Sequence, residues 1–162
     1  MNWQWVSFEE LSREELYEVL KVRQAVFVVE QNCPYQDADD LDPVSWHLLG
    51  WHEGRSGREL VAYLRVVFPG KKYPEPSIGR VLTTASVRGT GAGKELTSEA
   101  ITRIAREYPQ MSIRISAQRY LEKFYSEFGF ETVSAPYNED GIPHIEMLRK
   151  VQSMVQNKQL TF

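Results

Sequence analysis

The sequence lacks features that secreted, disulfide-bonded and membrane-spanning proteins require. It contains one cysteine, Cys33, so no disulfide can form within the chain, which fits a reducing compartment. No segment approaches the roughly 18 consecutive apolar residues of a membrane-spanning helix. The first residues have neither the basic start nor the apolar run of a signal peptide. We therefore expect a cytoplasmic protein with no membrane partner.

The sequence also has no excess of basic over acidic residues. The chain has 19 basic and 22 acidic side chains, for a formal net charge of −3. Nucleic-acid-binding domains usually carry a basic stripe, so no nucleic-acid partner is expected. Cys33 has no histidine at a spacing typical of zinc, and the aspartates of residues 37–42 do not follow the EF-hand pattern. The sequence therefore predicts no metal site.

The patterning predicts one α/β or α+β domain. Ser12 and Glu15 have the spacing of a capping box, which predicts a helix from about 13 to about 29. Trp3 and Trp5 alternate along an expected N-terminal strand. Further strands are expected near 45–52, 59–68, 78–87, 111–116, 130–137 and 143–150, and further helices near 92–107 and 119–128. We expect residues 1–150 to form a single domain with a mixed sheet, and residues 151–162 to form a C-terminal tail.

The most informative segment is the glycine-rich turn Arg88-Gly89-Thr90-Gly91-Ala92-Gly93, which lies between an expected strand and an expected helix. The first amides of a helix are unpaired and carry partial positive charge, so they attract a pyrophosphate. Glycines let the backbone approach such a ligand closely. Arg88 and Lys94 add charge on either side. A turn that merely joins strand to helix is the plainer alternative.

Two common phosphate-binding fingerprints fail at this turn. A Rossmann fingerprint needs glycine at position 94, which is Lys94, and an acidic residue about 20 positions later, which is missing. A P-loop needs glycine at position 88 and serine or threonine at position 95, which are Arg88 and Glu95. These failures disfavour a nucleotide-binding regulator.

The remaining pattern, Arg-x-x-Gly-x-Gly at 88, 91 and 93, resembles the coenzyme A pyrophosphate motif of the GNAT superfamily of N-acetyltransferases. Residues 117–130 (AQRYLEKFYSEFGF) resemble the second half of the GNAT site. Residues 26–42, 47–51 and 140–147 are similar to the ElaA-type branch. One departure is Ala85, where GNAT sequences often have proline.

The resemblance implies a fold, a cofactor and a partner. GNAT proteins have a mixed, mostly antiparallel central sheet of about six to seven strands flanked by helices. The implied cofactor is acetyl-CoA, and the implied acceptor is a primary amine of a small molecule or a protein. A homodimer is common among similar proteins. The implied cofactor-binding residues are Val81, Leu82, Thr83, Arg88, Gly89, Thr90, Gly91, Ala92, Gly93, Lys94 and Tyr125.

The resemblance also assigns chemistry. A backbone amide of about Val81 to Thr83 would stabilise the oxyanion, and Tyr125 would donate a proton to the departing thiolate. The alternative for Tyr125 is core packing beside its phenylalanine neighbours. The base stays open among Glu30, His144 and His47, each with a plain structural alternative, and a chain of waters.

Two further alternatives stay open. A non-catalytic acyl-CoA-binding regulatory module would need the glycine turn but not Tyr125.

The polar segment 31–44 contains four aspartates, Asp37, Asp39, Asp40 and Asp42. They either form a solvated loop, which is the plainer interpretation, or draw a cationic acceptor toward the site.

Overall fold

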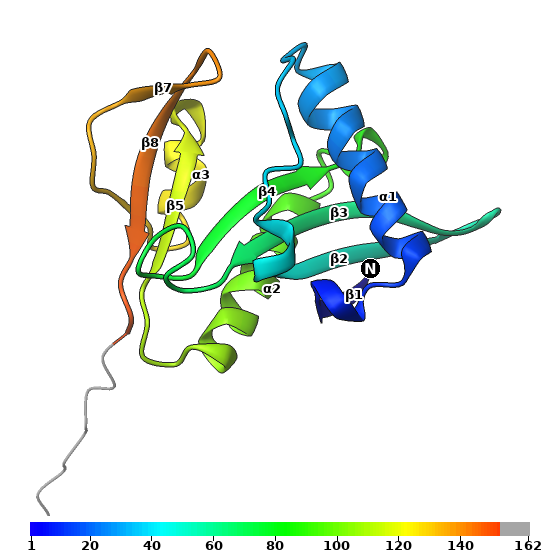
Figure 1. Cartoon of the computed structure of the whole chain (residues 1–162), viewed down its shortest axis with the longest axis horizontal. Helices are drawn as coiled ribbons and strands as arrows, with labels where there is room; N and C mark the ends of the chain where they lie inside the picture. Colours follow the sequence, from blue (N-terminus) through cyan, green and yellow to red (C-terminus); the bar gives the residue numbers. More distant parts are fainter. Residues whose placement is uncertain (153–162) are drawn as a thin grey trace, which may run out of the picture.

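The computed structural model describes residues 1–152, and its centre is one eight-stranded sheet in the order β1-β2-β3-β4-β5-β8-β6, with β7 paired to β8 (Figure 1). The strands are β1 Asn2–Ser7, β2 Ser45–Gly54, β3 Gly57–Val67, β4 Ser77–Thr83, β5 Ile113–Gln118, β6 Glu131–Thr132, β7 Tyr137–Glu139 and β8 Ile142–Arg149. The α-helices are α1 Arg13–Arg23, α2 Ala92–Glu107 and α3 Glu122–Ser126.

The predicted fold class, a mixed and mostly antiparallel sheet with flanking helices, is confirmed. Only the pairing of β4 with β5 is parallel within the described chain. The sheet has eight strands rather than six to seven because the strand expected near 130–137 is divided into β6 and β7, which both pair with β8. Residues 153–162, most of the expected tail, lie outside the described residues.

Two apolar cores lie on opposite faces of the sheet. Leu96, Ala100 and Ile104 of α2 pack against one face, together with Tyr125 of α3. Val19 and Val22 of α1 pack against the other face. Successive strand residues point to opposite faces, so β3 is buried on both sides, as its two apolar rows predict. No helix among residues 1–152 is long and apolar enough to cross a membrane.

The first helix changes its winding before it ends. Ser12 and Glu15 form the predicted capping box, with Ser12 Oγ accepting from the Glu15 amide at 3.0 Å. The α-helical part stops at Arg23, and residues 24–30 continue as a π-helical segment. Such segments are rare and often lie at functional sites. The predicted end near residue 29 is therefore close, but the change of winding was not predicted.

Strands β4 and β5 separate soon after they meet. Their pairing consists of Ser77 with Arg114 and Ile78 with Ile115. Beyond Ile78, β4 stays paired with β3, while β5 stays paired with β8. The sheet therefore opens into two diverging halves, and Figure 1 shows β5, β8 and α3 on one side and β1–β4 with α1 on the other.

Candidate functional site

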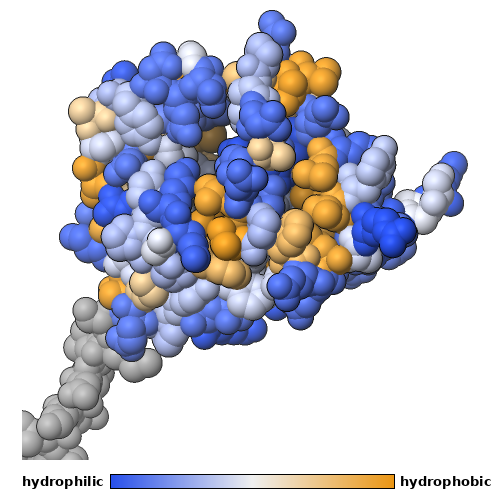
Figure 2. All heavy atoms as spheres, viewed as in Figure 1, coloured by the Kyte–Doolittle hydropathy of each residue, from blue (hydrophilic) through white to orange (hydrophobic). Residues whose placement is uncertain are grey.

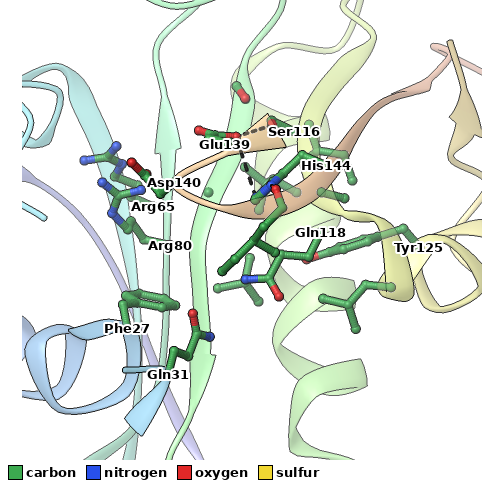
Figure 3. Close-up of a pocket in the computed structure, with 18 of the residues that line it drawn as sticks. Phe27, Gln31, Arg65, Arg80, Ser116, Gln118, Tyr125, Glu139, Asp140 and His144 are labelled. Atoms are coloured by element: carbon green, nitrogen blue, oxygen red, sulfur yellow. Dashed lines mark hydrogen bonds and ion pairs between the residues drawn. The ribbon is translucent and has the colours of Figure 1, made fainter. Parts of the chain in front are cut away.

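A cleft occupies the opening between β4 and β5. In the space-filling view the surface is hollowed between the two halves, with mostly polar side chains around the hollow (Figure 2). Its walls come from the π-helical segment, the 31–44 loop, β4, β5, α3 and the β7–β8 turn (Figure 3). Segments far apart in the chain thus converge on one cavity.

The edge of β4 that faces the cleft has no strand partner beyond Ile78. The β3–β4 register slips by one residue at Arg80 and Val81, which is a β-bulge. Arg80 has a φ of 53°, a left-handed conformation that costs a non-glycine residue about 1–2 kcal/mol. The Thr84 amide donates to Val61 O of β3 at 2.8 Å. Amides alternate along a strand, so the Thr83 amide points to the opposite edge, toward the opening.

This strand ends earlier than predicted. The expected strand near 78–87 stops at Thr83, and residues 85–87 form a 3₁₀ turn. The chain therefore turns before Arg88 and delivers the glycine-rich segment to the start of α2.

The glycine-rich turn leaves the N-terminus of α2 bare. Gly91 precedes the helix with a φ of 88°, and Gly89 has a φ of 77°, both in the left-handed region that glycine adopts freely. No side chain caps the first turn. A Cβ at Gly89, Gly91 or Gly93 would meet no atom within 4 Å, so the space outside the turn is open. Open space beside unpaired helix amides fits an anionic group such as a pyrophosphate.

Replacing Gly93 with glutamate should separate stability from anion binding. Gly93 lies inside α2 with ordinary helical geometry, and a carboxylate near a helix N-terminus stabilises the helix. We expect an unchanged or raised unfolding temperature. The same charge would repel a pyrophosphate by about 1–4 kcal/mol, which is about a fivefold or greater loss of coenzyme A affinity in titration calorimetry.

The matched control for this variant is Ala105→Glu, which adds the same charge to an exposed position of the same helix, away from its N-terminus. The control should bind coenzyme A as the unaltered protein does. Equal affinity in Gly93→Glu would mean that the turn holds no anion.

Arg88 is engaged with protein groups. Its Nε and Nη2 donate to Thr83 O at 3.0 and 2.9 Å, and Nη2 also donates to Glu30 Oε2 at 3.1 Å. The pairing with Arg88 lowers the pKa of Glu30. Glu30 does not line the cleft. A paired carboxylate outside the cleft is poorly placed to act as a base, so the structure argues against Glu30 in that role.

Tyr125 is buried and faces the cleft. Its side chain reaches from α3 toward the cavity (Figure 3). The ring packs edge-on against Phe124 and Phe130, with centroids 5.1 and 5.9 Å apart. Burial, with a smaller effect of Tyr120, raises the pKa of the Tyr125 phenol. The group is therefore both a packing element and a phenol that stays protonated at neutral pH.

The two candidate histidines lie in different places. His144 of β8 lines the cleft. His47 of β2 is fully buried outside it, with Nδ1 2.8 Å from Tyr63 Oη and Nε2 3.0 Å from Asp42 O. Burial lowers the pKa of His47. His47 is thus a hydrogen-bonded core residue, and its candidacy as a base has no geometric support.

The 31–44 loop is held by a closed ring of ion pairs. Three arginines and three aspartates alternate around this Arg–Asp ring in the order Arg23, Asp37, Arg80, Asp39, Arg65 and Asp42. The six N···O distances lie between 2.5 and 3.2 Å. Arg80 Nε is 2.8 Å from Asp37 Oδ1 but is not oriented for a hydrogen bond, so this contact is an ion pair only.

The ring contradicts the interpretation of the acidic segment as a solvated loop, whereas attraction of a cationic acceptor stays a prediction. Arg23, Arg65 and Asp42 are buried, so the loop is not merely solvated. Three of its four aspartates are compensated by arginines, which leaves Asp40 as the exposed carboxylate. Burial opposes ionisation of Asp39, but Arg65 and Arg80 together lower its pKa to about 2. That pairing stabilises the fold at neutral pH, and its contribution is lost as the pH falls from about 4 toward 2.

Sequence reasoning missed Ser116, Glu139 and Arg80, which also line the cleft. The turn containing Glu139 looked like an ordinary hairpin, and Ser116 looked like one position of a short strand. Arg80 offered a signal, because a charged residue in a β-branched strand needs a partner. Among residues 1–152 no group of three or more histidine, cysteine, aspartate or glutamate side chains is arranged to hold a metal ion.

Comparison with known proteins identifies relatives along almost the whole chain. The family model described as acetyltransferase (GNAT) domain matches residues 56–151. The UPF0039 protein sll0451 of Synechocystis is 50% identical over 93% of this chain and 96% of its own length. Protein ElaA of Escherichia coli is 42% identical over 93% of this chain and 97% of its own length.

Solved structures agree with these sequence relatives. The crystal structure of Escherichia coli ElaA superposes with a TM-score of 0.84 at 41% identity and covers 92% of this chain and 99% of the other. An acyl-CoA N-acyltransferase from Pseudomonas aeruginosa superposes with a TM-score of 0.85 at 38% identity, with the same coverage of 92% and 99%.

Proposed function

Because the chain belongs to the GNAT acetyltransferase family and is similar to ElaA, we propose that it transfers an acetyl group from acetyl-CoA to a primary amine. The observation that carries this proposal is the opening between β4 and β5, with the bare N-terminus of α2 after β4 and Tyr125 on the cleft wall. The acceptor is the amine of a small molecule or of an exposed protein side chain.

Acetyl-CoA fits the groups that line this opening. The amides of Ala92, Gly93 and Lys94 would hold the pyrophosphate, since the glycines leave the space beside them open. The unpaired edge of β4 has main-chain groups for an extended, amide-containing chain such as pantetheine. Bound there, acetyl-CoA would supply an activated acetyl group as a thioester.

The protein's own groups would then act on charge and protons. An amide of Val81 to Thr83 would donate to the carbonyl oxygen as negative charge develops there. Tyr125 would hold a proton for the departing sulfur, and its raised pKa keeps that proton in place at neutral pH. The ring of Arg23, Arg65 and Arg80 with its aspartates would fix the cleft wall that α1, the 31–44 loop and β4 form, opposite β5 and β8.

Ligand-dependent stability tests the cofactor directly. We expect acetyl-CoA and coenzyme A, each at about 1 mM, to raise the unfolding temperature, whereas NAD and ATP should not. A ligand at 100 times its Kd adds about 2.7 kcal/mol, which is about 5–10 °C for a domain of this size. Differential scanning fluorimetry makes the measurement.

The outcomes separate the competing functions. A shift with NAD or ATP alone, or with none of the four, would contradict the acetyltransferase proposal. A shift with acetyl-CoA but no thiol release with any amine would favour a regulatory module that binds acyl-CoA without catalysis.

A further inference from the structure

Polar side chains of β5, β7 and β8 form a connected cluster on one wall of the cleft. We call Ser116, Tyr137, Glu139 and His144 the cleft-wall cluster. Ser116 Oγ donates to Glu139 Oε2 at 2.9 Å and also contacts the Tyr137 hydroxyl. The Tyr137 and His144 rings stack with centroids 6.2 Å apart. Figure 3 shows Glu139 and His144 close to each other beside the cavity. Hydrogen bonds and ring stacking thus connect the four side chains.

The tautomer of His144 follows from one contact. Its Nδ1 lies 2.7 Å from Ile142 O, and a carbonyl oxygen can only accept a hydrogen bond. Nδ1 therefore carries the hydrogen, and in the neutral ring Nε2 has a free lone pair. This Nε2 lies 3.6 Å from Glu139 Oε2. Two acceptors this close repel each other unless a hydrogen-bond donor or a proton lies between them, and a cationic donor is attracted by the carboxylate as well.

Charges around the cleft favour a cation at this wall. Arg65 and Arg80 line the cleft but are compensated by aspartates of the Arg–Asp ring. Glu139 at the end of β7 and Asp140 in the turn that follows it are the carboxylates among the cleft-lining residues. Lys72 is a further cation of the lining; loss of solvation lowers its pKa, and the attraction of Glu139 opposes that shift. The carboxylates of the cleft lining therefore lie on the wall that carries His144.

We propose that Glu139 and His144 receive the acceptor as a primary alkylammonium ion and that His144 Nε2 removes its proton; this rests on the proposed function. In this step an N–H bond of the ammonium breaks and a bond from hydrogen to Nε2 forms. The electron pair stays on the amine nitrogen, which becomes the nucleophile. Glu139 stabilises the resulting imidazolium, which returns its proton to solvent after acetyl transfer.

The test compares amines that differ in charge. Thiol release from acetyl-CoA is measured with n-butylamine, 1,4-diaminobutane and lysinamide, which are cations at neutral pH, and with 4-methoxyaniline, which is uncharged. Glu139→Gln removes the charge and keeps an acceptor for Ser116. His144→Asn keeps a donor for Ile142 O and removes the titrating nitrogen. Glu131→Gln, an exposed carboxylate of β6 outside the cleft, is the matched control.

We expect the wild type to prefer the alkylamines. Both cleft variants should lower kcat/KM for the alkylamines about 10- to 100-fold, the range for a lost hydrogen bond to a charged group. They should leave the arylamine rate and the acetyl-CoA thermal shift unchanged, because neither needs a cation receptor. Glu131→Gln should match the wild type with every amine.

Several results would overturn the assignment. Unchanged alkylamine kinetics in both variants would remove Glu139 and His144 from acceptor binding, and an equal loss with the arylamine would reduce them to a structural role. If the wild type acetylates 4-methoxyaniline but none of the three alkylamines, the acceptor is not received as a primary alkylammonium ion. If one variant does not fold, the other decides. Failure of the proposed function is distinguishable, since either the acetyl-CoA thermal shift would be missing or no amine, 4-methoxyaniline included, would release thiol.

Discussion

Replacing Tyr125 with phenylalanine should lower the turnover of acetyl transfer about 100-fold while leaving acetyl-CoA binding intact. A positioned general acid contributes about 10²–10⁴ in rate, and 100-fold corresponds to about 2.7 kcal/mol in the barrier. The ring contacts with Phe124 and Phe130 would remain, so the fold should be preserved. Steady-state thiol release gives kcat, and the acetyl-CoA thermal shift reports binding.

Tyr17→Phe is the matched control, because Tyr17 is an exposed residue of α1 that lies outside the cleft. It should leave kcat unchanged. Burial raises the pKa of Tyr125, so the wild-type rate should not fall through pH 8–9 by loss of its proton. Full turnover in Tyr125→Phe would instead mean that the side chain serves only as packing beside Phe124 and Phe130.

The parts of the site that were predictable are those whose signals are local. A strand, a glycine-rich turn and a helix follow one another within residues 77–107, and their backbone geometry depends on that segment itself. The sequence therefore located the bare N-terminus of α2 and the glycines of the turn. Tyr125 was identified by a second short motif, and the structure places it on the same cleft. Its catalytic role stays a prediction.

The parts that were not predictable depend on contacts between distant segments. The Arg–Asp ring joins α1, the 31–44 loop, β3 and β4, and no spacing along the chain encodes it. The available signal was Arg65 within an otherwise apolar row of β3, and Arg23 beside Val19 and Val22. A buried arginine needs a carboxylate, and the nearby polar loop offered four. The proximity of His144 and Glu139 likewise depends on the pairing of β7 with β8.

The Arg–Asp ring should be the most sensitive electrostatic feature of the fold. Arg23→Met keeps much of the side-chain volume but leaves Asp37 and Asp42 with one arginine each. Removing one partner of a buried pair typically costs about 3–5 kcal/mol, and here it would leave a net negative charge buried in the ring. For a domain of this size that predicts an unfolding temperature lower by about 10 °C in differential scanning calorimetry.

Two controls isolate burial from charge. Lys21→Met removes an exposed cation and its pair with Glu18 from the same helix, and such a surface pair contributes at most about 1 kcal/mol. Asp40→Asn removes the loop's exposed aspartate, which lies outside the ring, and asparagine tolerates the left-handed φ of 65° found there. Both variants should have unfolding temperatures close to that of the wild type. If the unfolding temperature of Arg23→Met also equals that of the wild type, the cost of desolvating the charges cancels the attraction within the ring. The apolar contacts of α1 and the backbone of the loop would then hold this wall of the cleft.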